Sequence, residues 1–103
     1  MKVEWADNAK RQKNQVAYYI RRRFGINREK RFKQEVNQTI IMIMQHPNIG
    51  PIDPLFNDRP IAYRSVIING LSKMVYSIGD DTIYIVAFWD TRREPVQQAQ
   101  ETK

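Results

Sequence analysis

The dipeptide Asn69-Gly70 constrains the fold of this chain more than any other feature of its sequence. Both residues tolerate the positive φ angles of a type I′ turn, which joins two antiparallel strands through a two-residue loop. A second turn signal, Gly79-Asp80-Asp81, follows soon after. The apolar runs around these turns predict three consecutive strands, at residues 61–68, 73–78 and 82–89. The last run is apolar on both faces, as expected of a strand inside a sheet.

The N-terminal half of the chain has helical periodicity instead. Val3-Glu4-Trp5 alternates like a short strand, and Asp7 is a candidate N-cap for the helix that follows. Apolar residues then recur every three or four positions until Phe24-Gly25, where glycine favours a helix end. We expect Asn27 to cap a second helix, which ends before His46-Pro47 because a residue preceding proline avoids the α region. The connection of about three residues implies an antiparallel αα-hairpin.

These elements predict an α+β fold of order β-α-α-β-β-β, in which the αα-hairpin packs against an antiparallel β-sheet. The length of 103 residues suits one domain, which we place at residues 1–95, followed by a polar C-terminal tail at 96–103. No window approaches the roughly 18 apolar residues of a membrane span. The N-terminus is too polar for a signal peptide, and the absence of cysteine excludes disulfides and cysteine zinc sites. We therefore expect a cytoplasmic protein without membrane contact.

The positive charge is concentrated in the helical half. The chain has a net charge of +6, yet between Lys10 and Lys33 stand ten cations and a single acid, Glu29. Such a field favours an acidic partner, either nucleic acid or an acidic protein segment. The alternative is a solvated pair of helices, and the arginines at 21–23 also suit the end of a helix dipole.

No conventional catalytic motif is present. The only histidine, His46, precedes a proline at a helix end, where it is more typical of a surface or capping residue. The acids have no metal-ligand spacing and the four glycines form no phosphate loop, so we expect no metal and no cofactor.

Polar residues in the predicted meander are better candidates for a site. Arg64 lies inside an apolar strand, Lys73 opens the next, and Asp90 closes the last, followed by Arg92 and Arg93. Side chains on adjacent antiparallel strands lie about 5 Å apart, so these cations could share one face. With the tyrosines of the meander they would form a surface for phosphates and bases. Alternatively, Asp90 pairs with Arg92 or Arg93 and the tyrosines belong to the core. The sequence does not decide which face of the sheet Arg64 occupies.

Short motifs occur in a fixed order along residues 3–95: Val3-Glu4-Trp5, Ala9, Tyr18-Tyr19-Ile20, Phe24-Gly25, Pro47-Asn48-Ile49-Gly50, Tyr63-Arg64-Ser65-Val66, Lys73-Met74-Val75-Tyr76, Asp80-Asp81-Thr82-Ile83 and Trp89-Asp90-Thr91-Arg92-Arg93-Glu94-Pro95. This ordered set resembles the RelE/ParE superfamily of bacterial toxins, the toxic partners of type II toxin–antitoxin modules. The resemblance implies the same β-α-α-β-β-β fold, together with roles in growth inhibition and plasmid stabilization.

The superfamily divides by target, and the resemblance implies two functions. RelE-like members cut messenger RNA in the ribosomal A site, whereas ParE-like members poison DNA gyrase. The RelE-like catalytic cations would be Arg64, Lys73 and Arg92. RelE-like enzymes also carry a tyrosine or a histidine–tyrosine pair near the C-terminus, and residues 94–99 contain neither. We therefore favour a ParE-like inhibitor of gyrase.

The alternative is a ribosome-dependent endoribonuclease in which Tyr76 or Tyr84 serves as the acid or base. A third interpretation is a nucleic-acid-binding domain whose basic helices follow phosphates. In either toxin interpretation the residues predicted to contact the target are Arg64, Lys73, Tyr76, Asp90, Arg92 and Arg93.

The resemblance further implies a cognate antitoxin, which we expect to be acidic. We expect it to dock on the basic hairpin or on the exposed sheet edge, by helix-in-groove contact or strand addition. Arg11, Lys13 and Arg31 are the predicted contacts. Reversing their charges should weaken the complex and reduce its salt dependence.

Overall fold

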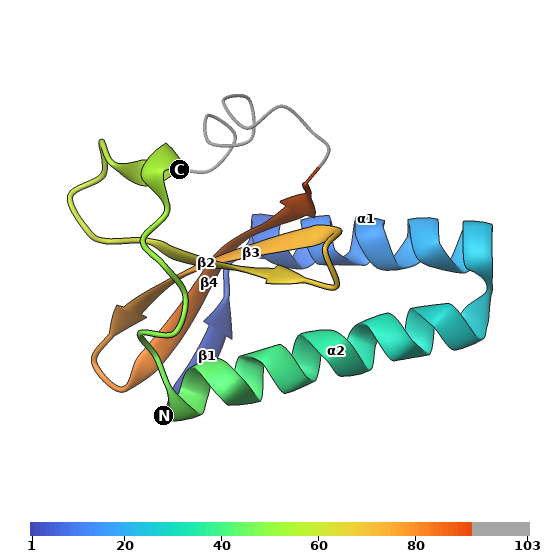
Figure 1. Cartoon of the computed structure of the whole chain (residues 1–103), viewed down its shortest axis with the longest axis horizontal. Helices are drawn as coiled ribbons and strands as arrows, with labels where there is room; N and C mark the ends of the chain where they lie inside the picture. Colours follow the sequence, from blue (N-terminus) through green and yellow to red (C-terminus); the bar gives the residue numbers. More distant parts are fainter. Residues whose placement is uncertain (92–103) are drawn as a thin grey trace.

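In the computed structural model, which describes residues 1–91, a helical hairpin covers one face of a four-stranded sheet (Figure 1). Its elements are β1 (Lys2–Trp5), α1 (Asp7–Phe24), α2 (Ile26–Gln45), the 3-10 turn η1 (Pro54–Phe56), β2 (Arg64–Ile68), β3 (Ser72–Gly79) and β4 (Thr82–Asp90). The α+β class and the order β-α-α-β-β-β are thus confirmed. The predicted tail at 96–103 lies outside the described residues.

The sheet has the order β1-β4-β3-β2. Strands β2, β3 and β4 form the predicted antiparallel meander. Asn69 and Gly70 have φ angles of 54° and 70°, which confirms the turn chemistry that the sequence predicts. The sheet is mixed rather than wholly antiparallel, because β1 pairs in parallel with β4 and places Val3 opposite Ile83. This pairing across the helical crossover puts β4 inside the sheet, which explains why its sequence is apolar on both faces.

The helix ends differ from the predicted caps. Ala6 is the N-cap of α1 and no side chain caps it, so Asp7 is the first helical residue, where its charge still suits the dipole. Gly25, with φ of 95°, is both the C-cap of α1 and the N-cap of α2. Asn27 therefore lies inside α2, and the predicted cap is wrong. A single glycine replaces the expected three-residue linker because φ of this sign is free of strain only without a Cβ.

The sheet is covered on both faces. On the helix face, Phe32, Ile43 and Phe88 belong to the larger core cluster. On the opposite face, Phe56 from the connection between α2 and β2 packs against Trp89 and its neighbours on β3 and β4. This connection, residues 46–63, lies over the sheet as a strap (Figure 1).

The two helices extend beyond the sheet. They contain 18 and 20 residues, which corresponds to about 27–30 Å of axis, whereas β3 has only 8 residues. Their joined ends around Gly25 therefore project past the strands (Figure 1). Residues 21–28 are all exposed. Within the described residues, neither helix is long and apolar enough to cross a membrane.

Candidate functional site

Lys73 lies on the sheet face that the strap covers. Its Nζ is 2.5 Å from Oδ2 of Asp53, whose side chain is fully buried, while the Lys73 side chain is 17% exposed. The other carboxylate oxygen of Asp53 accepts a hydrogen bond from the Leu55 backbone N–H at 2.9 Å, so it also caps η1. The Lys73 ammonium lies 5.8 Å from the centre of the Trp89 ring. Lys73 therefore ties the strap to the sheet, and Asp53 neutralises its charge.

Arg64 lies on the opposite, helix-side face. It is the cross-strand partner of Tyr76, whereas Lys73 is three residues from Tyr76 and so points the other way. The Arg64 guanidinium donates to the carbonyl oxygens of Asn48 and Gly50, at 3.2 and 2.8 Å. The structure thus does not bring Arg64 and Lys73 together, and the shared cationic face expected from the sequence does not form between them.

Tyr76 is completely buried. Its hydroxyl donates to the carbonyl of Pro47 at 2.7 Å and accepts from the N–H of Gly50 at 3.0 Å. Burial raises the pKa of Tyr76 above its ordinary value, although the Gly50 hydrogen bond and the Arg64 charge oppose the shift. A phenol that is buried, neutral and doubly hydrogen-bonded fixes the start of the strap. Its ring has no exposed face on which a base could stack.

The other predicted target contacts are Asp90, Arg92 and Arg93. Asp90 is half-buried and stands opposite Ser72. Arg92 and Arg93 lie outside the described residues. Of the remaining meander tyrosines, Tyr63 packs against Phe56 with ring centres 5.3 Å apart, and Tyr84 is 38% exposed.

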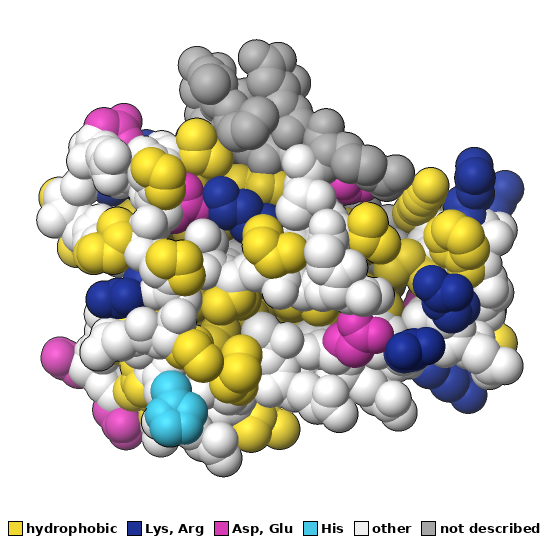
Figure 2. All heavy atoms as spheres, in the orientation of Figure 1, with side chains coloured by type: hydrophobic (Ala, Val, Ile, Leu, Met, Phe, Trp, Pro, Cys, Tyr) yellow, Lys and Arg dark blue, Asp and Glu magenta, His cyan; other side chains and the backbone are white. Residues whose placement is uncertain are grey.

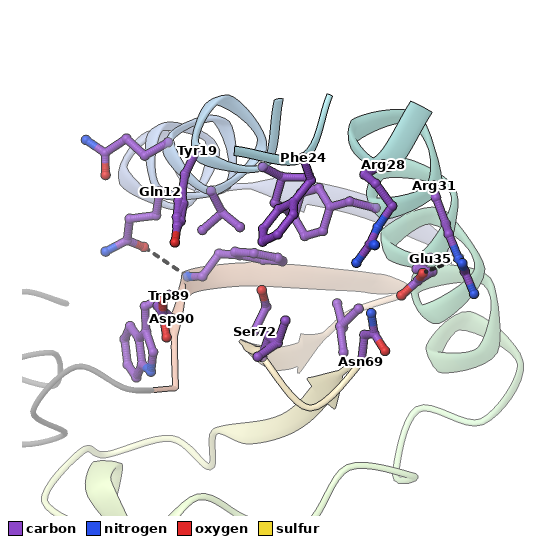
Figure 3. A pocket seen from close by; sticks show the side chains of 17 residues that line it. Gln12, Tyr19, Phe24, Arg28, Arg31, Glu35, Asn69, Ser72, Trp89 and Asp90 are labelled. Carbon is purple, nitrogen blue, oxygen red and sulfur yellow. Dashed lines mark hydrogen bonds and ion pairs between the residues drawn. The ribbon is translucent and has the colours of Figure 1, made fainter. Parts of the chain in front are cut away.

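A groove of about 650 Å³ lies between the helical hairpin and the β2–β3 end of the sheet (Figure 3). Apolar side chains from both helices and the sheet line it, among them Val16, Ile20, Phe32, Ile68 and Phe88. Arg28, Arg31 and Asp90 are among its polar lining residues. A concave apolar site with a few charged groups is the usual form of a binding site.

Side-chain hydrogen bonds from α1 fix one wall of the groove. The register between β3 and β4 shifts at Val75/Tyr76, so the ladder is interrupted there. Gln12 accepts from the backbone N–H of Phe88 at 2.9 Å, and Asn8 donates to the carbonyl of Val86 at 3.2 Å. The helix thereby satisfies strand groups beside the irregularity and holds its groove-lining face in place.

Only some of the residues that line this groove were predicted from the sequence to contact a partner. Of the three predicted antitoxin contacts, Arg31 lines it, with its Nε 3.4 Å from a Glu35 carboxylate oxygen. Arg11 does not line it, and Lys13 lies 4.8 Å from the centre of the Trp5 ring. The groove itself was missed, although Phe24 continues the apolar stripe of α1 and yet is 56% exposed. An apolar stripe that extends past the sheet is the signal that could have indicated it.

Comparisons with known proteins agree with this architecture. The family model described as "ParE toxin of type II toxin-antitoxin system, parDE" matches residues 3–95. A solved structure titled "Chromosomal ParDE TA system from P. aeruginosa" superimposes with a TM-score of 0.69 at 14% identity, covering 87% of this chain and 95% of that chain. At that identity the likeness shows the fold alone. A search of the curated proteins found no match. Because the family model spans nearly the whole chain, the protein belongs to the ParE family of type II toxins, within the RelE/ParE superfamily.

Proposed function

We propose that this toxin inhibits DNA gyrase by binding it and is neutralised by an acidic antitoxin. The observation that carries the first part is the separation of Arg64 and Lys73 on opposite faces of the sheet. Both cations already hold the strap, through Asn48 and Gly50 carbonyls or through Asp53. Within residues 1–91, Arg64 and Lys73 therefore do not share the face that a RelE-like cation cluster would need, which supports inhibition by binding. The ParE family model supports the gyrase-directed branch of the superfamily.

The ribonuclease alternative carries an energetic penalty. For Lys73 to reach a scissile phosphate it would have to leave Asp53, whose carboxylate has no exposed surface. Stranding one partner of a buried ion pair costs about 3–5 kcal/mol. A catalytic cluster of Arg64, Lys73 and Arg92 would thus compete with the anchoring of the strap.

Two assays separate these functions. Purified toxin should inhibit gyrase supercoiling of relaxed plasmid, and induction in cells should provoke a DNA-damage response while messages stay intact. Primer extension on messages from induced cells checks whether the messages stay intact. Cuts at ribosomal A sites without an effect on supercoiling would overturn the gyrase proposal and favour the ribonuclease.

The antitoxin, in our proposal, lays an amphipathic helix into the groove. The groove offers an apolar floor for a stripe at positions i, i+4 and i+7, which is the usual helix-in-groove mode. Phe24 extends the apolar surface, while Arg28 and Arg31 stand where acids on the helix could meet them (Figure 3). Glu35 and Asp90 also line the groove, so the match to an acidic partner is local to the two arginines, while the apolar floor provides the match in shape.

Binding measurements with matched variants test this docking. Phe24→Asp should weaken antitoxin affinity at least tenfold, because it places a charge on an apolar contact. Ile41→Asp is the control, since Ile41 on α2 has a similar exposure, 54% against 56%, but does not line the groove. Likewise Arg31→Glu should weaken binding more than Arg11→Glu. Equal losses in each pair would refute the groove as the antitoxin site.

A further inference from the structure

The projecting end of the helical hairpin, together with the adjoining turns of both helices, carries a net charge equal to that of the whole protein. We define the hairpin tip as residues 18–33, which contain seven lysines and arginines and one acid, Glu29. Its net charge of +6 equals that of the full chain, so the other residues hold ten cations and ten acids. Figure 2 shows Lys and Arg side chains gathered at this end of the molecule. Charge concentrated at one end attracts and orients a polyanion.

Most of this charge is not neutralised internally. Lys33 lies 3.8 Å from Glu29 and Arg31 lies 3.4 Å from Glu35. The other cations of the hairpin tip form no ion pair within residues 1–91; these are Arg21, Arg22, Arg23, Arg28 and Lys30. A dense group of exposed, unneutralised cations repels itself, and an anionic ligand would relieve that repulsion.

Aromatic rings are interleaved with these cations. The guanidinium carbons of Arg22, Arg23 and Arg28 lie 5.7, 5.9 and 5.3 Å from the ring centres of Tyr18, Tyr19 and Phe24. Tyr18 is 60% exposed and Phe24 is 56% exposed. Arg22 also donates to the Tyr18 hydroxyl at 3.0 Å, so that pair is held in place.

This exposure distinguishes the rings from core residues. Tyr18 and Phe24 each expose more than half of their surface, so both side chains remain accessible to a ligand although a guanidinium lies beside each. A ring with a free face, beside a cation, can stack on a base while the cation contacts the adjoining phosphate.

We propose that the hairpin tip binds single-stranded nucleic acid, with its arginines on phosphates and Tyr18 and Phe24 stacked on unpaired bases. Repeated arginine–aromatic pairs favour this ligand over an acidic protein segment, which would engage the cations without needing several stacking platforms. They also favour a single strand over a duplex, whose base faces are already stacked. The proposal does not depend on gyrase as the target. Phe24, Arg28 and Arg31 belong to both the hairpin tip and the groove, but Tyr18 and Arg22 do not line the groove, so variants at these two positions test the tip separately.

The test is fluorescence anisotropy of the purified full chain with labelled DNA and RNA single strands of about 20 nucleotides and the matching duplex. Salt is varied between about 50 and 200 mM. We expect either single strand to bind at least tenfold tighter than the duplex. A single strand loses about 0.7 in log–log salt slope for each phosphate contact removed. The triple variant Arg21→Gln, Arg22→Gln, Arg23→Gln should therefore flatten the slope by about 2.

Two further variants complete the design. The control Lys2→Gln, Lys10→Gln, Arg11→Gln removes the same charge from exposed positions outside the hairpin tip and should leave the slope unchanged. Tyr18→Ala should weaken single-strand binding roughly 5- to 150-fold, the range for losing one stacked base, and leave duplex binding unchanged. Circular dichroism checks that each variant is folded.

Three results would overturn the proposal. One is an equal flattening of the salt slope in the triple variant of the hairpin tip and in the control triple variant, which would indicate attraction by net charge alone. Another is duplex binding as tight as single-strand binding together with an unchanged Tyr18→Ala affinity, which would indicate phosphate contact without stacking. The third is equally tight binding of polyglutamate, which would make the hairpin tip a general polyanion surface.

Discussion

Removing the Asp53 carboxylate should destabilise the protein, and removing the Lys73 ammonium together with it should restore most of the loss. Asp53→Asn keeps an oxygen that can accept from the Leu55 N–H, so it removes the charge while preserving the cap of η1. Lys73→Met keeps the aliphatic stem that packs beside Trp89. The double variant replaces the ion pair by neutral groups of similar volume.

The expected magnitudes follow from the burial of the pair. Asp53 has no exposed surface, so Lys73→Met strands a buried charge and should cost about 4 kcal/mol, within the range for a broken buried pair. The Lys73 side chain is 17% exposed, and water near its ammonium should limit the cost of Asp53→Asn to about 3 kcal/mol. The double variant should lie within about 2 kcal/mol of wild type, because replacing both charges is often nearly neutral. The coupling energy is then about 5 kcal/mol.

Urea unfolding of the four proteins measures these values. For a domain of this size the stability is about 5–15 kcal/mol, so each single variant should lower the transition midpoint by 1 M or more at an m-value of about 1–3 kcal/mol per M. An unchanged m-value identifies the effect as a loss of stability rather than a change in the unfolded state. Additive effects, with a coupling below about 0.5 kcal/mol, would refute the description of Lys73 as an anchor of the strap.

The same variants decide the role of Lys73 in toxicity. If Lys73 acts only through the strap, the double variant, whose stability is restored, should inhibit growth as wild type does. If Lys73 contacts the target, the double variant is folded but inactive, and the contact predicted from the sequence is correct. Growth assays at matched expression, together with the urea data, separate the two outcomes.

Tyr76→Phe should cost about 2 kcal/mol by urea unfolding, because it leaves the Pro47 carbonyl and the buried Gly50 N–H without the hydroxyl. The raised pKa of Tyr76 stabilises the fold below the unfolded pKa of about 10, and this contribution should disappear as pH rises through the folded value; a phenylalanine at 76 should lack that alkaline loss. Gly50→Ala should cost about 1–3 kcal/mol because its Cβ would lie 2.8 Å from the backbone oxygen of Ser65. Gly79→Ala should cost less, since its close neighbour is a tyrosine ring that can move; equal thermal shifts in the two variants would contradict this reasoning.

Local patterns in the sequence determined the elements and their order. The turn at Asn69-Gly70 depends on two adjacent residues, and the helices depend on apolar spacing of three or four. Both signals act over a few residues, so they can be recognised without knowing the fold. The cap prediction at Asn27 erred by two positions, because the chain ends its first helix and starts the second at one glycine; the cap predicted at Asp7 is Ala6, one position earlier.

The tertiary structure alone decided what the cations do. The strand alternation that separates Arg64 from Lys73 is visible only once the register with Tyr76 is known. The partners of these cations are carbonyls and a carboxylate on the strap, and Arg64 and the Asn48 carbonyl that it contacts lie 16 positions apart in the chain. The groove likewise depends on long-range pairing: β1 pairs with β4, and the helical hairpin between β1 and β2 then packs on the sheet, so that residues from both line the groove. Composition shows that the hairpin is basic, but only its projection past the strands leaves that charge in water, because no sheet remains there to cover it.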